Sequence, residues 1–263
     1  MQTFDNETMI IECFADLKRR DIFMMGNKFS CQKIYLSIKG LLKNKAWINS
    51  SGKNDPPPDF YNDKNHIMME VMRFDDHAYE DKKGHIHNES LKHEGEIYKK
   101  YFKDMHRDDL KLFIIPDTKL PTNEDHNFNR YYSSFKRVFE KHASKIDLYK
   151  SHHPSYKMIF FVFDESSAYI QTTNKASLTD YCNGKDVMVM PHYPFLDRCF
   201  IDIIKQSKVD YVIWYSPYKL LQYNTGKRIK ILPLPKGIII DVANIHDDQL
   251  RDYNYELMAS SEK

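Results

Sequence analysis

The chain has 263 residues, of which 41% are hydrophobic, 14% aromatic and 29% charged, a balance typical of a globular protein with its own core and not of a disordered chain. No run approaches the roughly 18 consecutive apolar residues that a membrane-spanning helix needs. The formal net charge of +2 is too small to indicate nucleic-acid binding by itself, so only local charge patterns bear on that question.

The four cysteines, Cys13, Cys31, Cys182 and Cys199, are scattered along the chain and include no Cys-x-x-Cys pair. This spacing argues for reduced thiols and against a zinc ribbon. The N-terminal stretch carries acidic residues where a secretory signal would carry lysines. We therefore expect a cytoplasmic protein that does not associate with a membrane.

In the first half of the chain, apolar residues recur at helical spacing in three places and predict helices at residues 5–21, 32–43 and 90–105. Residues 46–59 hold a short strand and a turn rich in Ser, Gly, Asn and Pro, and residues 66–74 predict a strand partly buried on both faces. Residues 75–89 are polar, acidic and rich in histidine, and we interpret them as a loop.

The second half begins with a short strand predicted at residues 110–116 and a helix at residues 128–146. Residues 156–165, "YKMIFFVFDE", give the strongest strand signal, because a nearly continuous apolar run suits a central strand covered on both sides. The remaining predicted elements are a helix at residues 195–207, strands at 209–216 and 237–242, and a hairpin-like segment at 228–237.

Strands and helices alternate through much of the chain, so we predict an α/β fold with a mixed central sheet flanked by helices. We expect one domain over residues 1–263, with a core of residues 1–175 and a C-terminal subdomain of residues 176–263 as the alternative. The sequence has no Walker-type loop and no kinase signature, and its 8 glycines leave few phosphate-cradling loops, which argues against a nucleotide-dependent enzyme.

Two acidic residues around the strand at residues 66–74 have the setting of metal ligands. Asp59 follows three prolines and would begin one strand of a hairpin, and Glu70 would lie on the next strand, close to it in space. Hydrolysis of a phosphodiester with Mg²⁺ needs hard oxygen ligands, because the ion neutralises the phosphate and lowers the pKa of the attacking water. Carboxylates on adjacent strands of a hairpin supply that arrangement.

In these residues the chain resembles the PD-(D/E)XK nuclease superfamily. Pro58-Asp59 matches the first half of the motif, and Glu70-Val71-Met72 matches the second half except at its last position. The resemblance implies a restriction-endonuclease-like core, Mg²⁺ or Mn²⁺ held by Asp59 and Glu70, and DNA as the partner. It leaves the role of the motif lysine empty, because Met72 can neither donate a proton nor carry a charge.

The same resemblance points to two further residues. Members of the family commonly have a glutamate on an N-terminal helix, and Glu12 lies on the predicted first helix in the right order along the chain. The missing cation would come from elsewhere, with Arg73, Lys64, Lys92 and Lys99 as candidates.

Ordinary structural roles stay open for the motif residues. Aspartate after proline is a frequent turn residue, and Glu70 can be the polar member of a strand. Against this, a lone glutamate inside "HIMMEVM" is costly if it is buried without a partner. The same two interpretations apply to the acidic pair Asp164 and Glu165, which follows the strongest strand. Ligand sites gather at the carboxyl ends of strands, but turn residues are found there too.

Histidines in the polar segment at residues 75–89 form a second candidate metal site. His85 and His87 are two residues apart, so on a strand they would face the same side and could share a metal. The chain has no helical His-Glu-x-x-His arrangement and no cysteine near these histidines, which favours a solvated loop as the alternative. If the loop crosses the Asp59 and Glu70 site, one histidine would serve as a general base, and His77 is the nearest to Glu70 along the chain.

The segment at residues 205–236 is a candidate nucleic-acid surface. Cations hold phosphates and aromatic rings stack on unpaired bases, and both residue types alternate here. An ordinary aromatic core strand with a solvated basic face is the alternative. The residues expected to bind nucleic acid are Lys219, Lys227, Arg228, Lys230 and Trp214.

These patterns predict a Mg²⁺-dependent protein that binds and cleaves nucleic acid. The main alternative is a non-catalytic mobile-element or phage protein that binds nucleic acid or another protein with the same fold. A second alternative is a metal-dependent hydrolase centred on the histidine-rich loop.

Overall fold

The computed structural model describes residues 7–40, 46–50, 58–102, 126–217, 219–224 and 229–261. The strand predicted at residues 110–116 lies outside the described residues, as do Lys227 and Arg228. None of the helices within the described ranges combines the length and hydropathy that crossing a bilayer requires.

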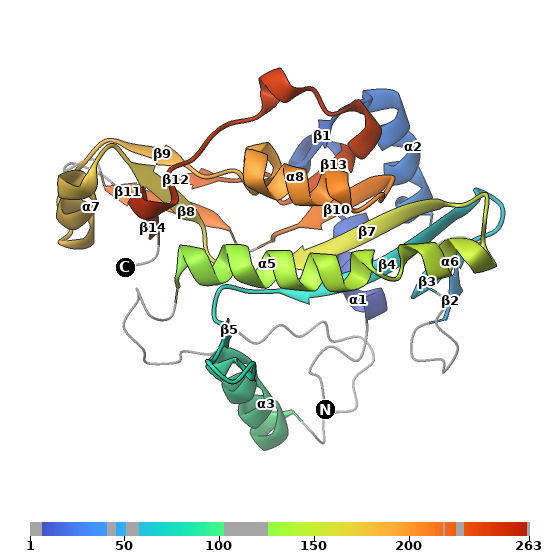
Figure 1. Cartoon of the computed structure of the whole chain (residues 1–263), viewed down its shortest axis with the longest axis horizontal. Helices are drawn as coiled ribbons and strands as arrows, with labels where there is room; N and C mark the ends of the chain where they lie inside the picture. The colour runs from blue at the N-terminus through green and yellow to red at the C-terminus, as the bar shows by residue number, and fades with distance from the viewer. Residues whose placement is uncertain are drawn as a thin grey trace.

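A seven-stranded mixed sheet forms the centre of the fold (Figure 1). In order across the sheet, the strands are β1 (Ile22–Met25), β13 (Gly237–Asp241), β10 (Tyr211–Tyr215), β7 (Lys157–Asp164), β4 (Ile67–Phe74), β3 (Phe60–Asn62) and β2 (Ile48–Asn49). The strands β4, β7 and β10 run parallel to one another, whereas β3 and β13 run antiparallel to β4 and β10 respectively. The carboxyl ends of three parallel strands therefore meet at one edge.

Helices cover both faces of this sheet, which explains why β4 and β7 are apolar along most of their length. One face carries α1 (Glu7–Ala15) and α2 (Lys28–Lys39); the other carries α5 (Phe128–Ala143), α6 (Ile146–His152) and α8 (Arg198–Gln206). In Figure 1, α5 runs across the front of β4 and β7. Gly237 lets α1 pack closely on β13, because a Cβ there would lie 2.7 Å from a ring carbon of Phe14.

Smaller elements surround the sheet. At the left of Figure 1 lie a three-stranded sheet of β14 (Met258–Ser260), β8 (Tyr169–Thr172) and β9 (Val189–Pro191), the helix α7 (Lys175–Cys182) and the hairpin of β11 (Leu220–Asn224) and β12 (Ile229–Pro233). Near β4 are the hairpin of β5 (Tyr79–Glu80) and β6 (Ile86–His87) and the helix α3 (Glu89–Tyr101). Short 3₁₀ helices are η1 (Arg19–Asp21), η2 (Pro194–Leu196), η3 (Val242–Asn244), η4 (Asp247–Gln249) and η5 (Tyr255–Leu257).

The predicted α/β class with a mixed sheet flanked by helices is confirmed. Two details differ from the prediction: residues 75–89 contain the β5–β6 hairpin, and β12 pairs with β11 instead of folding back within residues 228–237. Pro235 lacks the amide proton that a return strand after β12 would need. The strands β10 and β13 lie inside the central sheet, so segments from both sides of residue 175 share one core.

Candidate metal and phosphate site

The β3–β4 hairpin places Asp59 beside Glu70. Phe60 pairs with Met69 in antiparallel register, so the residue before Phe60 lies opposite the residue after Met69. Oδ2 of Asp59 also accepts a hydrogen bond of 2.7 Å from the backbone amide of Val71. The two carboxyl groups thus lie on neighbouring strands, in the arrangement that the sequence suggested.

Glu70 is buried, with 4% of its surface exposed, and side chains of the helical layer hold it. Nδ1 of His142 lies 2.7 Å from Oε1 of Glu70, and the Tyr149 hydroxyl donates to the same oxygen at 2.8 Å. Burial and the charge of Glu70 raise the pKa of Tyr149, so this phenol stays protonated and remains a donor. The buried carboxyl group therefore has the partners that a lone one would lack.

Asp59 lies in an acidic environment. Burial and the negative charge of Glu70 raise the pKa of Asp59 well above its usual range, and Glu7 acts in the same direction. The hydrogen bond from Val71 and the charge of Lys145 oppose this shift. Carboxyl groups that repel one another in this way favour a divalent cation, because the ion replaces the repulsion with attraction.

One oxygen of each carboxyl group is left for a ligand. Within the described residues, Asp59 Oδ1 and Glu70 Oε2 accept no hydrogen bond, whereas Asp59 Oδ2 and Glu70 Oε1 do. Mg²⁺ binds one or two protein carboxylates and keeps several waters. Two oxygens of this kind therefore fit the ion that the family resemblance implies.

The acidic residue that α1 brings to this site is Glu7. Its charge acts on Asp59, and its side chain lines the cleft beside the two carboxyl groups. Glu12, which the sequence suggested, lies five residues later on α1, a rotation of about 140° around the helix axis. The structure therefore brings Glu7, and not Glu12, to the cleft.

A cleft of about 480 Å³ runs along the part of β4 that β3 leaves unpaired. Its opposite wall is a stripe of α5 that includes Arg137, Lys141 and His142, spaced so that they share one face of the helix. Neither Arg137 nor Lys141 has an acidic partner within ion-pair distance among the described residues. The cleft therefore has cations along one wall and reaches the Asp59 and Glu70 pair through two lining residues, Val71 and His142, that bond to those carboxyl groups. This charge pattern suits a phosphate and a divalent cation together.

The position of the absent motif lysine belongs to the core. Met72 is 3% exposed and packs in the apolar cluster under α5. Arg73 does not replace the lysine, because its guanidinium forms ion pairs with Glu94 and Glu165. Lys145, at the start of α6, is a cation whose charge does act on Asp59.

A second groove of about 620 Å³ continues from the cleft along α5 and shares Ser134 and Arg137 with it. Arg130 and Lys136 add positive charge there, and the Arg130 guanidinium lies 4.6 Å from the centre of the exposed Tyr79 ring. The outer face of α5 is thus basic over much of its length.

The predicted histidine cluster separates into two groups. His85 and His87 lie on the exposed β5–β6 hairpin, and their ring nitrogens lie 3.3 and 3.0 Å from Oδ2 of Asp81. His77 lies instead beside Asp76 and His126, a group whose potential ligand atoms are all within 4.8 Å of one another. In the described part of the chain this is the one group of three or more side chains with metal-ligand spacing, so the grouping of His77 with His85 and His87 is not formed.

Two of the residues predicted to bind nucleic acid are buried. Trp214 is fully buried in β10 and Lys219 is 5% exposed. Nε1 of Trp214 donates to Oδ2 of Asp164 at 2.8 Å, and Nζ of Lys219 lies 3.0 Å from the same oxygen. Their prediction as surface residues is wrong, because the aromatic run is a core strand. Lys230 lies in β12.

Sequence reasoning missed Arg137, Lys141 and Lys145 as site residues. A signal was present: these cations recur four residues apart on one amphipathic helix and its extension. The position of Arg137 and Lys141 in the cleft wall, and of Lys145 near Asp59, was not visible, because it depends on how α5 and α6 pack on the sheet.

Comparisons with known proteins gave no match to a family model, to a curated protein or to a solved structure.

Proposed function

We propose that this protein binds the phosphate backbone of DNA in the cleft between β4 and α5 and cleaves it with Mg²⁺ or Mn²⁺ held by Asp59 and Glu70. One observation carries the proposal: each of these neighbouring carboxyl groups keeps an oxygen that accepts no hydrogen bond from the described residues, and both groups contact residues that line the cleft, Asp59 through Val71 and Glu70 through His142. The resemblance to PD-(D/E)XK nucleases supports the same assignment.

Each residue has a defined task in this proposal. A bound divalent ion would supply charge neutralisation of the phosphate and activation of water. Asp59 and Glu70 hold the ion, and His142 and Tyr149 fix the orientation of Glu70 through their bonds to Oε1. Arg137 and Lys141 bind backbone phosphates, and Lys145 supplies the positive charge near Asp59 that Met72 cannot.

A second candidate is a DNA-binding protein that uses the same cleft without cleavage. The observation that favours it is the buried Met72, which leaves the most direct contributor to catalysis in the family absent from its usual position. Both candidates bind DNA through the basic wall of α5. They differ only in whether a bound metal ion leads to cleavage of the DNA.

Incubation of supercoiled plasmid with metal-free protein, followed by addition of Mg²⁺ or Mn²⁺, tests cleavage. We expect the wild-type protein to nick the plasmid and Asp59→Asn and Glu70→Gln each to reduce this activity by more than roughly 100-fold. Loss of a residue that only supports a metal ligand can cost up to about that factor, and loss of the ligand itself should cost more. Glu7→Gln should also reduce nicking, whereas Glu12→Gln on the same helix is the matched control and should not. Nicking that persists in both ligand variants would reveal a contaminant.

Binding separates the two candidates. If wild-type protein binds a DNA duplex in the presence of EDTA but never nicks it with either ion, the non-catalytic function holds. If it neither binds nor nicks, both candidates are wrong. Circular dichroism of every variant shows whether lost activity reflects lost folding.

A further inference from the structure

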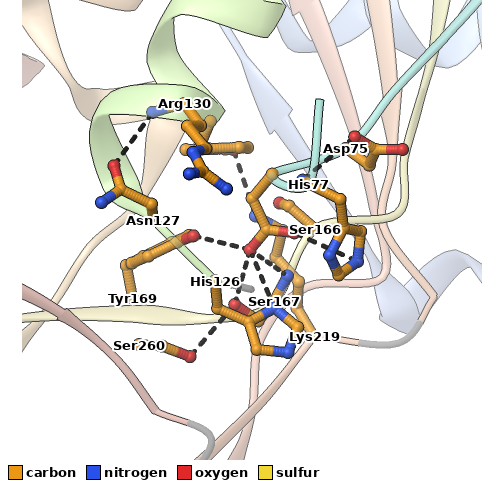
Figure 2. Close-up of polar contacts among 12 residues, drawn as sticks. Asp75, His77, His126, Asn127, Arg130, Ser166, Ser167, Tyr169, Lys219 and Ser260 are labelled. Carbon is orange, nitrogen blue, oxygen red and sulfur yellow. Dashed lines mark hydrogen bonds and ion pairs between the residues drawn. The ribbon is translucent and has the colours of Figure 1, made fainter. Parts of the chain in front are cut away.

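A second polar cluster lies at the carboxyl end of β4, beyond Phe74. Asp76 has no exposed surface and is surrounded by residues from distant parts of the chain. Figure 2 shows His77, His126, Ser167 and Tyr169 converging at this point, together with Ser260 from β14. The cluster connects the end of β4 with the start of α5 and with β8.

The two carboxylate oxygens of Asp76 differ in their hydrogen bonds. Oδ2 accepts hydrogen bonds from the Tyr169 hydroxyl at 2.6 Å and from the Ser167 hydroxyl and amide at 2.8 and 3.2 Å. Oδ1 is buried and has no hydrogen-bond partner in the described residues. Nε2 of His77 lies 3.7 Å from Oδ1, beyond hydrogen-bond distance, and Nδ1 of His126 lies 3.3 Å from Oδ2.

These separations match a metal site. In tetrahedral coordination with bonds of about 2.0–2.1 Å, neighbouring ligand atoms lie about 3.4 Å apart. The 3.7 Å between Nε2 of His77 and Oδ1 is close to that value, and potential ligand atoms of all three side chains lie within 4.8 Å of one another. A simple ion pair would bring the His77 nitrogen closer and would give Oδ1 its missing hydrogen bond.

We propose that Asp76, His77 and His126 bind a divalent first-row transition metal ion such as Zn²⁺ or Fe²⁺. Two imidazole nitrogens and one carboxylate select such an ion over Mg²⁺, which prefers oxygen ligands alone. Three protein ligands leave a coordination position for water or another ligand.

The surroundings of Asp76 have the features of a built metal site. Ser167 and Tyr169 act as outer partners that fix the carboxylate. The side chains of His77 and His126 are 13% and 15% exposed, so an ion can reach the cluster from the surface.

This site is separate from the cleft site. Asp76 follows Glu70 by six residues, or roughly 20 Å of extended chain, whereas the ions of a two-metal phosphodiesterase lie about 4 Å apart. We therefore expect the transition metal to tie the start of α5 to the end of β4, and to act independently of Asp59 and Glu70.

Metal titration of full-length, chelator-treated protein tests the proposal. We expect one equivalent of Zn²⁺ by elemental analysis after dialysis, a rise in Tm on binding, and intense visible absorption with Co²⁺ as the probe of low coordination number. His77→Gln and His126→Gln should each weaken Zn²⁺ binding by more than about 100-fold. The double variant His85→Gln/His87→Gln removes two nearby, more exposed histidines and is the matched control.

The proposal is overturned if wild-type protein retains no Zn²⁺ or Fe²⁺, or if the control lowers affinity as much as the ligand variants do. Asp76→Asn is a poor first test, because it disturbs a buried network. Asp59→Asn and Glu70→Gln should leave Zn²⁺ binding unchanged, which keeps a failure here distinct from a failure of the cleft proposal.

Discussion

Two acidic groups at the central sheet, Asp164 and the pair of Asp59 and Glu70, differ in how many of their carboxylate oxygens accept hydrogen bonds. Asp164, at the end of β7, is fully buried, and donors from four side chains contact its two oxygens: Tyr131, Ser166, Trp214 and Lys219. Asp59 and Glu70 contact Val71 and His142, which line a cleft, and each keeps one oxygen that accepts no hydrogen bond from the described residues. Both groups gave similar signals in the sequence, an acidic residue next to an apolar strand.

This difference distinguishes a carboxylate with a structural role from carboxylates that can bind a ligand. A carboxylate whose acceptor sites are filled by buried donors has no capacity for a ligand, and it stabilises the fold only while every partner is present. A carboxylate with an oxygen left over beside a cleft can hold an ion. The Asp164 network is therefore interpreted as structural, and the Asp59 and Glu70 pair as a site.

The largest effect is expected at Asp164. Asp164→Asn removes the counter-charge of the buried Lys219 and should cost about 3–5 kcal/mol of unfolding free energy, measured by urea denaturation. The double variant Asp164→Asn/Lys219→Met removes both charges and should regain most of that loss. A single variant that costs less than about 1 kcal/mol would contradict the structural role, given how much a buried unpaired charge costs.

The basic wall of α5 should dominate DNA binding. Arg137→Gln/Lys141→Gln should weaken affinity for duplex DNA of any sequence and lower the slope of log K against log salt by about two, one for each phosphate contact. Fluorescence anisotropy at several salt concentrations measures this slope. Lys185→Gln, an exposed lysine paired with Asp180, is the control and should change nothing. An unchanged slope in the double variant would place the DNA elsewhere.

Removal of the Asp59 charge should have the opposite effect on stability to removal of the Asp164 charge. Asp59→Asn removes repulsion from Glu70 directly across the hairpin, so metal-free protein should gain up to about 1 kcal/mol of stability. The same variant should lose the rise in Tm that Mg²⁺ or Mn²⁺ gives the wild type. Thermal unfolding with and without the ion measures both effects, with Asp248→Asn, at an exposed site in η4, as the control. A metal-free variant less stable than wild type would argue for a structural Asp59.

The smallest effect concerns a buried histidine outside both acidic groups. Burial lowers the pKa of His192, although the carboxylate of Asp197, 2.8 Å away, acts in the other direction. As pH falls through about 6.5, the His192 ring of the unfolded chain takes up a proton that the folded chain binds less readily, so the free energy of unfolding decreases on acidification. The full contribution of neutral His192 to stability is present above that pH. Urea midpoints at pH 5.5 and 7.5 measure this slope. His192→Gln should reduce it, and an unchanged slope would exclude His192 as its source.

Local signals predicted the elements well where the chain is apolar. The strands β4 and β7 follow from continuous hydrophobic runs, and α5 follows from aromatic residues at helical spacing. The hairpin that joins Asp59 to Glu70 was predictable because only a short turn separates the two strands. The rotation of α1 about its axis was not predictable, so Glu12 was predicted at the position that Glu7 occupies.

The sequence by itself determined the α/β class and the neighbouring carboxyl groups of the β3–β4 hairpin, because both depend on residues close together in the chain. The tertiary structure alone decided that Trp214 and Lys219 are buried, that α5 supplies the cations of the cleft, and that His126 joins Asp76 across fifty residues of sequence. Contacts between distant segments follow from packing and helix rotation, for which a single sequence carries no local signal.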